Sequence, residues 1–147
     1  MDKAPHVLLA EDTAPLAEAL KMSLEGFGMH VTLALDGWSA ARVLAQGTID
    51  VLVTDYFLPG LTGSQLCFLV RDNYTRRRLP VIMITGKTHE LDQKWLIKEH
   101  NLVALLPKPI KPKELADLIA ACYAEPANSL PDLQAPNEVK CSQVQPS

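Results

Sequence analysis

Five polar side chains in this sequence could together carry out phosphoryl chemistry. Each stands at or just after the end of a short apolar run: Glu11, Asp12, Asp55, Thr85 and Lys108. Clustered carboxylates repel one another unless a cation lies among them, and oxygen ligands suit Mg²⁺. An aspartate is a competent nucleophile toward a phosphoryl group, and an ammonium neutralises the charge that develops on phosphoryl oxygens. If the fold brings the five together, the sequence predicts a magnesium-dependent phosphoryl site.

Each of these residues has a simpler interpretation when it is taken alone. Asp55 could be a cap or turn residue before Pro59, and Glu11 and Asp12 could favour the positive end of a following helix. Thr85 could be an ordinary β-branched strand residue, and Lys108 could be a solvated surface lysine. The elements that position these side chains therefore decide between chemistry and local structure.

Short apolar runs alternate with amphipathic segments along the chain. The runs cover residues 6–10, 30–35, 50–54, 80–85 and 102–107. Several are continuously apolar, which is typical of parallel strands buried on both faces. Segments with helical periodicity follow them, at 13–28, 37–47, 64–74, 89–101 and 111–125. This (βα)₅ order predicts a doubly wound α/β fold, and in such a sheet the functional crevice lies at the carboxyl ends of the strands.

Helix ends and faces are predicted from individual residues. Thr13 is expected to cap the first helix with its side chain, and Gly26 or Gly28 to end it. Helical spacing places Phe27 on the apolar face of the first helix and Trp95 on that of the fourth.

Composition narrows the class of protein. The 147 residues are 48% hydrophobic and 21% charged, which is typical of one soluble globular domain. A net charge of −3 offers no basic excess for binding nucleic acid, so no direct DNA binding is expected. No apolar stretch is long enough to span a membrane. The three cysteines are widely spaced, which favours neither a disulfide framework nor a zinc site and makes a reducing cytoplasmic setting the default.

The composition changes near the C-terminal end. Residues 124–147 are rich in proline and small polar residues and show no sustained period. The sequence therefore predicts one folded domain over 1–123 and a mostly irregular tail over 124–147.

Four short motifs carry a resemblance to a known family. They are AED at 10–12, DYFLPGLTG at 55–63 with the pattern D-x-x-x-P-x-x-x-G, TG at 85–86 and KP at 108–109. In this order and spacing they resemble the receiver domain of two-component response regulators, over residues 5 to about 123. The resemblance implies a flavodoxin-like, five-stranded parallel sheet with strand order 2-1-3-4-5.

The resemblance also implies a role for each matching residue. Asp55 would be the phosphoacceptor, Thr85 the switch hydroxyl and Lys108 the phosphate-contacting lysine. Besides Asp55, the ligands of Mg²⁺ would be Glu11, Asp12 and the backbone carbonyl of Phe57, with Asp12 favoured over Glu11 as the direct ligand. The Lys108–Pro109 peptide would be cis. The phosphoryl donor would be a phosphohistidine on a sensor histidine kinase or a histidine phosphotransfer protein.

Three positions bear on how such a receiver would signal. Leu105 stands where the family often has an aromatic residue that moves on phosphorylation, so the usual switch is in doubt. Output through the fourth helix and a muted output are the alternatives. Phe57 and Lys87 flank the phosphoryl position, and we hypothesise that they shield the acyl phosphate and slow its loss.

The resulting expectation is a stand-alone receiver, because no output domain follows residue 123. It would signal through a partner-binding face formed by helix four, strand five and helix five, and would be no enzyme beyond its own aspartyl phosphorylation and dephosphorylation. A phosphorelay intermediate and a degenerate receiver that acts as a scaffold are the alternatives. An aspartyl phosphatase is disfavoured because Phe57 stands where a general acid is needed. A flavodoxin-like cofactor protein is disfavoured because the acids after the first strand would repel a phosphate.

Overall fold

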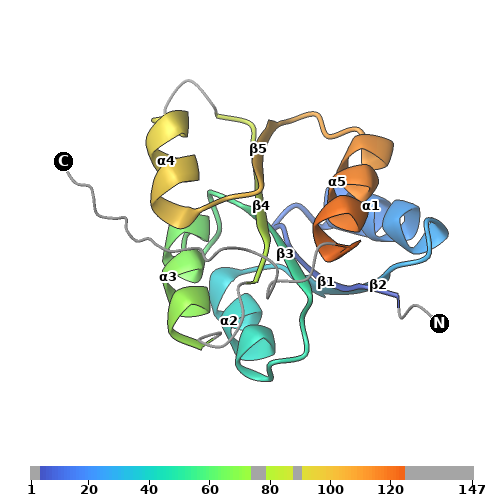
Figure 1. The fold of residues 1–147 in the computed structure, drawn as a ribbon, viewed down its shortest axis with the longest axis horizontal. Coiled ribbons are helices and arrows are strands. Elements are labelled where there is room, and N and C mark those ends of the chain that lie inside the picture. The colour runs from blue at the N-terminus through green and yellow to red at the C-terminus, as the bar shows by residue number, and fades with distance from the viewer. Residues whose placement is uncertain (1–3, 74–78, 88–90, 125–147) are drawn as a thin grey trace.

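A five-stranded parallel sheet forms the centre of the protein (Figure 1). The computed structural model describes residues 4–73, 79–87 and 91–124. The strands are β1 (His6–Ala10), β2 (His30–Ala34), β3 (Val51–Asp55), β4 (Val81–Thr85) and β5 (Ala104–Pro107). They lie in the order β2-β1-β3-β4-β5, and every neighbouring pair is parallel. The predicted fold class and strand order are confirmed.

Five helices cover the two faces of this sheet. They are α1 (Ala14–Gly26), α2 (Gly37–Ala45), α3 (Gly63–Asn73), α4 (Gln93–His100) and α5 (Pro112–Ala124). Figure 1 shows α1 and α5 together on one face, with α2, α3 and α4 on the other. This two-sided cover follows from right-handed connections between parallel strands whose order reverses beside β1.

Strand residues alternate between two hydrophobic cores. Leu8, Leu52 and Met83 pack on the side of α2 and α3, whereas Leu9 and Ile84 pack on the side of α1 and α5. All five are fully buried. Because successive side chains point to opposite faces, burial on both faces requires an unbroken apolar run, which is what the sequence of each central strand contains.

The ends of α1 differ in part from the prediction. Thr13 occupies the N-cap position, but its side chain makes no capping hydrogen bond. One reason is that Pro15, in the first turn, has no amide hydrogen to donate. The helix ends at Gly26, and Gly28 follows with φ of +93°, a conformation that glycine adopts without strain.

The fourth helix is shorter than the segment 89–101 that its sequence period suggested: it begins at Gln93 and ends at His100. Asp92 caps it by accepting a hydrogen bond from the amide of Trp95 at 3.0 Å. Asn101 ends it in the left-handed conformation, and the amide of Leu102 donates back to the carbonyl of Ile97. Leu102 therefore closes the helix, which is why β5 starts at Ala104 rather than at residue 102.

Two large apolar side chains that the helical spacing placed on an inward face, Phe27 and Trp95, lie outside the core instead. Trp95 is 51% exposed because the neighbouring Leu96 occupies the inward position of α4. Phe27 is 49% exposed because it lies beyond the last turn of α1.

Among the described residues, no helix is long and apolar enough to cross a membrane. The predicted boundary at residue 123 falls one residue before the end of α5, and residues 125–147 lie outside the described part.

Candidate functional site

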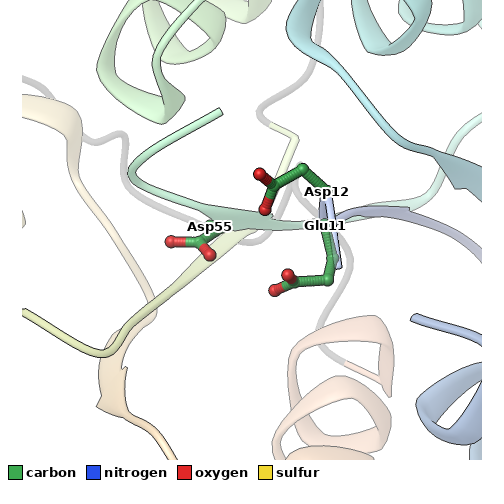
Figure 2. Close-up of side chains that lie close together, drawn as sticks. All are labelled: Glu11, Asp12 and Asp55. Atoms are coloured by element: carbon green, nitrogen blue, oxygen red, sulfur yellow. The ribbon is translucent and has the colours of Figure 1, made fainter. Parts of the chain in front are cut away.

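The carboxyl ends of four strands bring the polar residues singled out in the sequence to one edge of the sheet. Glu11 and Asp12 follow β1 directly, Asp55 and Thr85 are the last residues of β3 and β4, and Lys108 follows β5. Figure 2 shows the three carboxylates close together at the ends of β1 and β3. One ligand oxygen from each lies within 4.8 Å of the others. The fold therefore assembles the cluster that the strand ends predicted.

The two neighbouring acids after β1 have opposite surroundings. Glu11 is completely buried, whereas Asp12 is exposed to solvent. Asp55 is 5% exposed. The site thus contains two desolvated carboxylates, Glu11 and Asp55, and one solvated carboxylate, Asp12. Only the buried pair needs a counter-charge from the protein.

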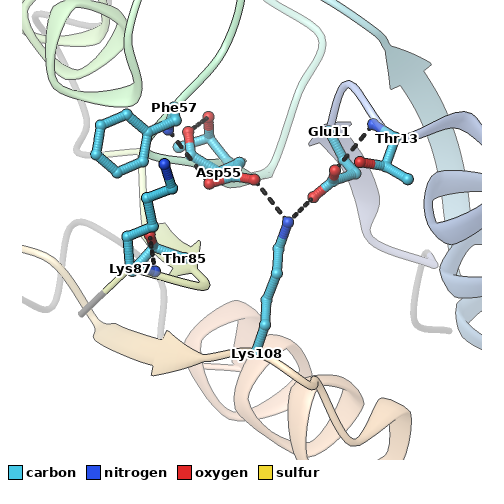
Figure 3. A network of polar contacts seen from close by, with 8 residues as sticks. Glu11, Thr13, Asp55, Phe57, Thr85, Lys87 and Lys108 are labelled. Atoms are coloured by element: carbon cyan, nitrogen blue, oxygen red, sulfur yellow. Dashed lines mark hydrogen bonds and ion pairs between the residues drawn. The ribbon is translucent and has the colours of Figure 1, made fainter. Parts of the chain in front are cut away.

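Lys108 supplies that counter-charge. Its Nζ donates to Asp55 Oδ2 at 2.7 Å and lies 2.9 Å from Glu11 Oε1 (Figure 3). Burial opposes the charge on the ammonium, but the interactions with Asp55 and Glu11 outweigh it and raise the pKa of Lys108. The lysine is therefore held as a cation between two buried carboxylates.

The two buried carboxyls respond differently to the same lysine. Burial raises the pKa of Asp55 above its ordinary value, although Lys108 partly offsets this effect. Burial acts in the same direction on Glu11, but the ion pair with Lys108 and the hydrogen bond from the Thr13 amide to Oε2 at 2.9 Å lower its pKa overall. Glu11 is thus the more firmly ionised member of the pair.

The donor set fits a hard divalent cation. Oε1 of Glu11 is buried and, apart from its ion pair with Lys108, receives no aligned hydrogen bond from the described residues. Together with Asp12 and Asp55 it offers three carboxylate ligands, the type that Mg²⁺ prefers. Two of these three carboxylates, Glu11 and Asp55, already pair with Lys108, so a metal that they held would add to the positive charge that Lys108 provides.

The loop after Asp55 is folded tightly against the end of β3. The amide of Gly63 donates to the carbonyl of Tyr56 at 2.7 Å, and a Cβ at Gly63 would lie 2.6 Å from the carbonyl oxygen of Asp55. The amide of Phe57 donates to Asp55 Oδ1 at 3.2 Å. The glycine that closes the D-x-x-x-P-x-x-x-G pattern is therefore required by close backbone approach.

The end of β4 forms the other wall of the site. Thr85 is fully buried, and its Oγ1 accepts a hydrogen bond from the amide of Lys87 at 3.1 Å. The Nζ of Lys87 lies 5.4 Å from the centroid of the Phe57 ring, within the range of a cation–π interaction (Figure 3). The two residues hypothesised to shield the site thus contact each other, which sequence separation alone did not indicate.

Two further positions bear on the resemblance. The Lys108–Pro109 peptide is cis, as the resemblance implied. Leu105 is half-buried on β5 and packs against the core beneath α2, α3 and α4. The resting position of Leu105 is therefore toward that core.

A parallel sheet of order 2-1-3-4-5 with three carboxylates and a lysine at its carboxyl edge defines the class of receiver proteins. The chain belongs to the response regulator receiver domain family, whose family model matches residues 7–120. It is thus a receiver domain of two-component signalling.

Solved structures of receivers resemble this chain over nearly all of their length. A putative response regulator from Chloroflexus aurantiacus is 30% identical, with 83% of this chain and 99% of that chain covered and a TM-score of 0.74. A Francisella response regulator receiver domain is 28% identical, with 82% and 97% covered and the same score. The receiver domain of a sensor histidine kinase from Pseudomonas aeruginosa is 26% identical, with 83% and 99% covered, a TM-score of 0.74 and a magnesium ion in its active-site cleft.

Proposed function

We propose that this receiver accepts a phosphoryl group on Asp55 in a Mg²⁺-dependent reaction with a phosphohistidine donor. The observation that carries the proposal is the position of Asp55, which is buried at the end of β3 between a lysine and two further carboxylates. A carboxylate oxygen of Asp55 attacks phosphorus, the P–N bond breaks, and the imidazole leaves and takes up a proton. Attack of water on phosphorus later returns inorganic phosphate and the free carboxylate.

The residues around Asp55 have distinct roles in this proposal. Lys108 moves its ion pair from the Asp55 carboxylate to a phosphoryl oxygen, which lowers the cost of the charge that develops there. The Thr85 hydroxyl already accepts from Lys87, so its own hydrogen is available to donate to another phosphoryl oxygen. Glu11, Asp12, Asp55 and the carbonyl of Phe57 would hold Mg²⁺, which when bound supplies further charge neutralisation. The magnesium ion in the Pseudomonas aeruginosa receiver supports this assignment.

The same proposal covers the partners. A sensor histidine kinase or histidine phosphotransfer protein donates the phosphoryl group, and a downstream protein reads a face formed by α4, β5 and α5. The chain catalyses only its own aspartyl phosphorylation and dephosphorylation. The cytoplasmic setting expected from the cysteines stays a prediction.

A relay role is the second candidate, in which Asp55 passes its phosphoryl group to a histidine phosphotransfer protein. The similarity of this chain to the receiver domain of a sensor histidine kinase supports this second candidate. Transfer of radiolabel from the phosphorylated chain to such a protein would identify a relay, whereas phosphorylation-dependent binding without transfer would identify a switch.

The test of phosphoacceptance is intact mass spectrometry after incubation with Mg²⁺ and acetyl phosphate. We expect one added phosphoryl group in the wild type, none in Asp55→Asn and none after chelation of Mg²⁺. Asp12→Asn is the matched acidic control, since it should raise the concentration of Mg²⁺ that phosphorylation requires while leaving the acceptor in place. A wild-type chain that takes up no phosphoryl group, or an Asp55→Asn variant that still does, would overturn the proposal.

A further inference from the structure

A buried histidine joins α3 to α4 away from the carboxylate cluster. His100, the last residue of α4, is 8% exposed, and its Nε2 lies 2.6 Å from Oγ of Ser64 on α3. Its Nδ1 is buried and has no hydrogen-bond partner among the described residues. A neutral imidazole has one donor and one acceptor nitrogen, so Ser64 satisfies one of them and the other is left unpaired in either tautomer.

Aromatic rings enclose the imidazole. Phe68 of α3 and Trp95 of α4 pack edge-to-face with it, with ring centroids at 5.1 and 6.0 Å. The guanidinium of Arg71 lies 5.0 Å from the centroid of Phe68 and donates to the carbonyl of Glu99 at 2.9 Å. The contact between α3 and α4 around His100 thus combines ring packing with two hydrogen bonds, one between Ser64 and His100 and one from Arg71 to the carbonyl of Glu99.

A single residue, Gly63, connects Ser64 to the backbone around the phosphoacceptor. Ser64 directly follows Gly63, whose amide is bonded to the carbonyl of Tyr56 and whose Cα has no room for a Cβ beside Asp55. The carboxylate of Asp55 in turn accepts from the amide of Phe57. A change at this carboxylate that moves Tyr56 and Phe57 must therefore move the start of α3, because close-packed backbone leaves no slack.

We propose that the Ser64–His100 hydrogen bond carries the state of the Asp55 carboxylate to the C-terminal end of α4. The inference rests on the proposed function, in which Asp55 is phosphorylated. A separation of 2.6 Å is at the short end for a hydrogen bond, so displacement of Ser64 lengthens and weakens it. The weakened contact releases the end of α4, and this route to α4 needs no aromatic residue at position 105.

The protonation of His100 reports on this contact. Burial, with the positive charge of Arg71 as a smaller effect, lowers the pKa of His100, while Glu99 acts weakly in the opposite direction. The adjacent strand β5 carries no titratable side chain between residues 104 and 107. Loosening the α3–α4 contact admits water to the buried ring, and this raises the pKa of His100 toward its ordinary value.

The test is an NMR titration of the histidine ring protons of the full chain, with Mg²⁺ alone and with Mg²⁺ and beryllofluoride as a phosphoryl mimic. We expect beryllofluoride to raise the His100 pKa by about 0.7 pH unit or more, which corresponds to the roughly fivefold lower limit of typical allosteric coupling. The exposed His30 is the internal control and should not shift. Ser64→Ala should lose most of the shift, and Ser64→Thr, which keeps a hydroxyl, should retain it.

Bound beryllofluoride is followed separately by its ¹⁹F signal, so the two proposals fail in different ways. A bound signal with an unchanged or lowered His100 pKa would overturn the coupling and leave the phosphoacceptor role intact. A full shift in Ser64→Ala would also overturn it. No bound signal in the wild type would overturn both proposals.

Discussion

Replacement of Lys108 by methionine removes the ammonium that lies between the buried carboxylates of Glu11 and Asp55. The methionine keeps most of the apolar stem, so the change is mainly one of charge. In the wild type the ammonium lies 2.9 Å from an oxygen of Glu11 and 2.7 Å from an oxygen of Asp55, and the Lys108 side chain is only 23% exposed. The variant therefore leaves two desolvated carboxylates next to each other without a counter-charge.

The expected loss follows from burial. Breaking a buried ion pair by removing one partner costs about 3–5 kcal/mol. The partial exposure of Lys108 and the ability of the carboxyls to take up protons reduce this cost. We therefore expect the free energy of unfolding to fall by about 2–3 kcal/mol at pH 7 in Lys108→Met.

The loss should shrink as the pH falls. In the wild type the pKa of Glu11 is lowered, so its contribution to stability is present above the pKa of the unfolded chain and is lost as pH falls through the lower folded value. In Lys108→Met, burial without a counter-charge raises the pKa of both Glu11 and Asp55. The folded variant then binds protons that the unfolded chain does not, so its stability rises between pH 7 and pH 5.

Urea denaturation followed by circular dichroism, at pH 7 and pH 5, measures both effects. Lys98→Met removes an exposed lysine of α4 and is the matched control, for which we expect a change within about 0.5 kcal/mol at either pH. Because the carboxylates of Glu11 and Asp55 lose their counter-charge in Lys108→Met, Mg²⁺ should stabilise this variant more than the wild type. A loss in Lys108→Met as small as that of the control, or equal losses at both pH values, would refute the reasoning.

Three further predictions concern the surroundings of the site. Phe57→Ala and Lys87→Ala should each shorten the lifetime of the acyl phosphate by about two- to fivefold, because a partly exposed cation–π contact is worth about 0.5–1 kcal/mol. The lifetime is measured by loss of the phosphorylated mass, and unchanged lifetimes would count against shielding. Gly63→Ala should lower the unfolding free energy by about 2 kcal/mol or more in urea, because its Cβ would meet the carbonyl oxygen of Asp55; wild-type stability would show that the loop can yield. Cys67 is buried, and burial raises the pKa of its thiol to about 12. Iodoacetamide at pH 8 should therefore modify Cys67 only after denaturation, as followed by peptide mass spectrometry. Rapid labelling of the folded chain would contradict its burial.

The sheet and the membership of the site could be predicted from sequence for a simple reason. An unbroken apolar run records burial on both faces of a strand, and the carboxyl ends of parallel strands share an edge. Asp55 and Lys108, 53 residues apart, could therefore be placed together from the ends of their runs. No side-chain packing had to be known.

Helix faces were less predictable because periodicity does not say how far a helix rotates toward its neighbour. Both Leu96 and Trp95 fit the apolar stripe of α4, and only packing against the sheet decided that Leu96 is buried and Trp95 exposed. Thr13 has a side chain of the capping type but makes no capping hydrogen bond, since Pro15 removes a donor; the amide of Thr13 donates to Glu11. Local propensity was overridden by these contacts in each case.

The sequence by itself determined that an acid ends the third strand and that an acid pair, a hydroxyl and a lysine stand at equivalent strand ends. Only the tertiary structure decided that Glu11 is buried while Asp12 is solvated, and that Lys108 bridges Glu11 to Asp55. It also decided that Ser64 meets His100, 36 residues away. Residue type and order set which groups reach an edge or a face, whereas burial and pairing depend on contacts between segments that are distant in the chain.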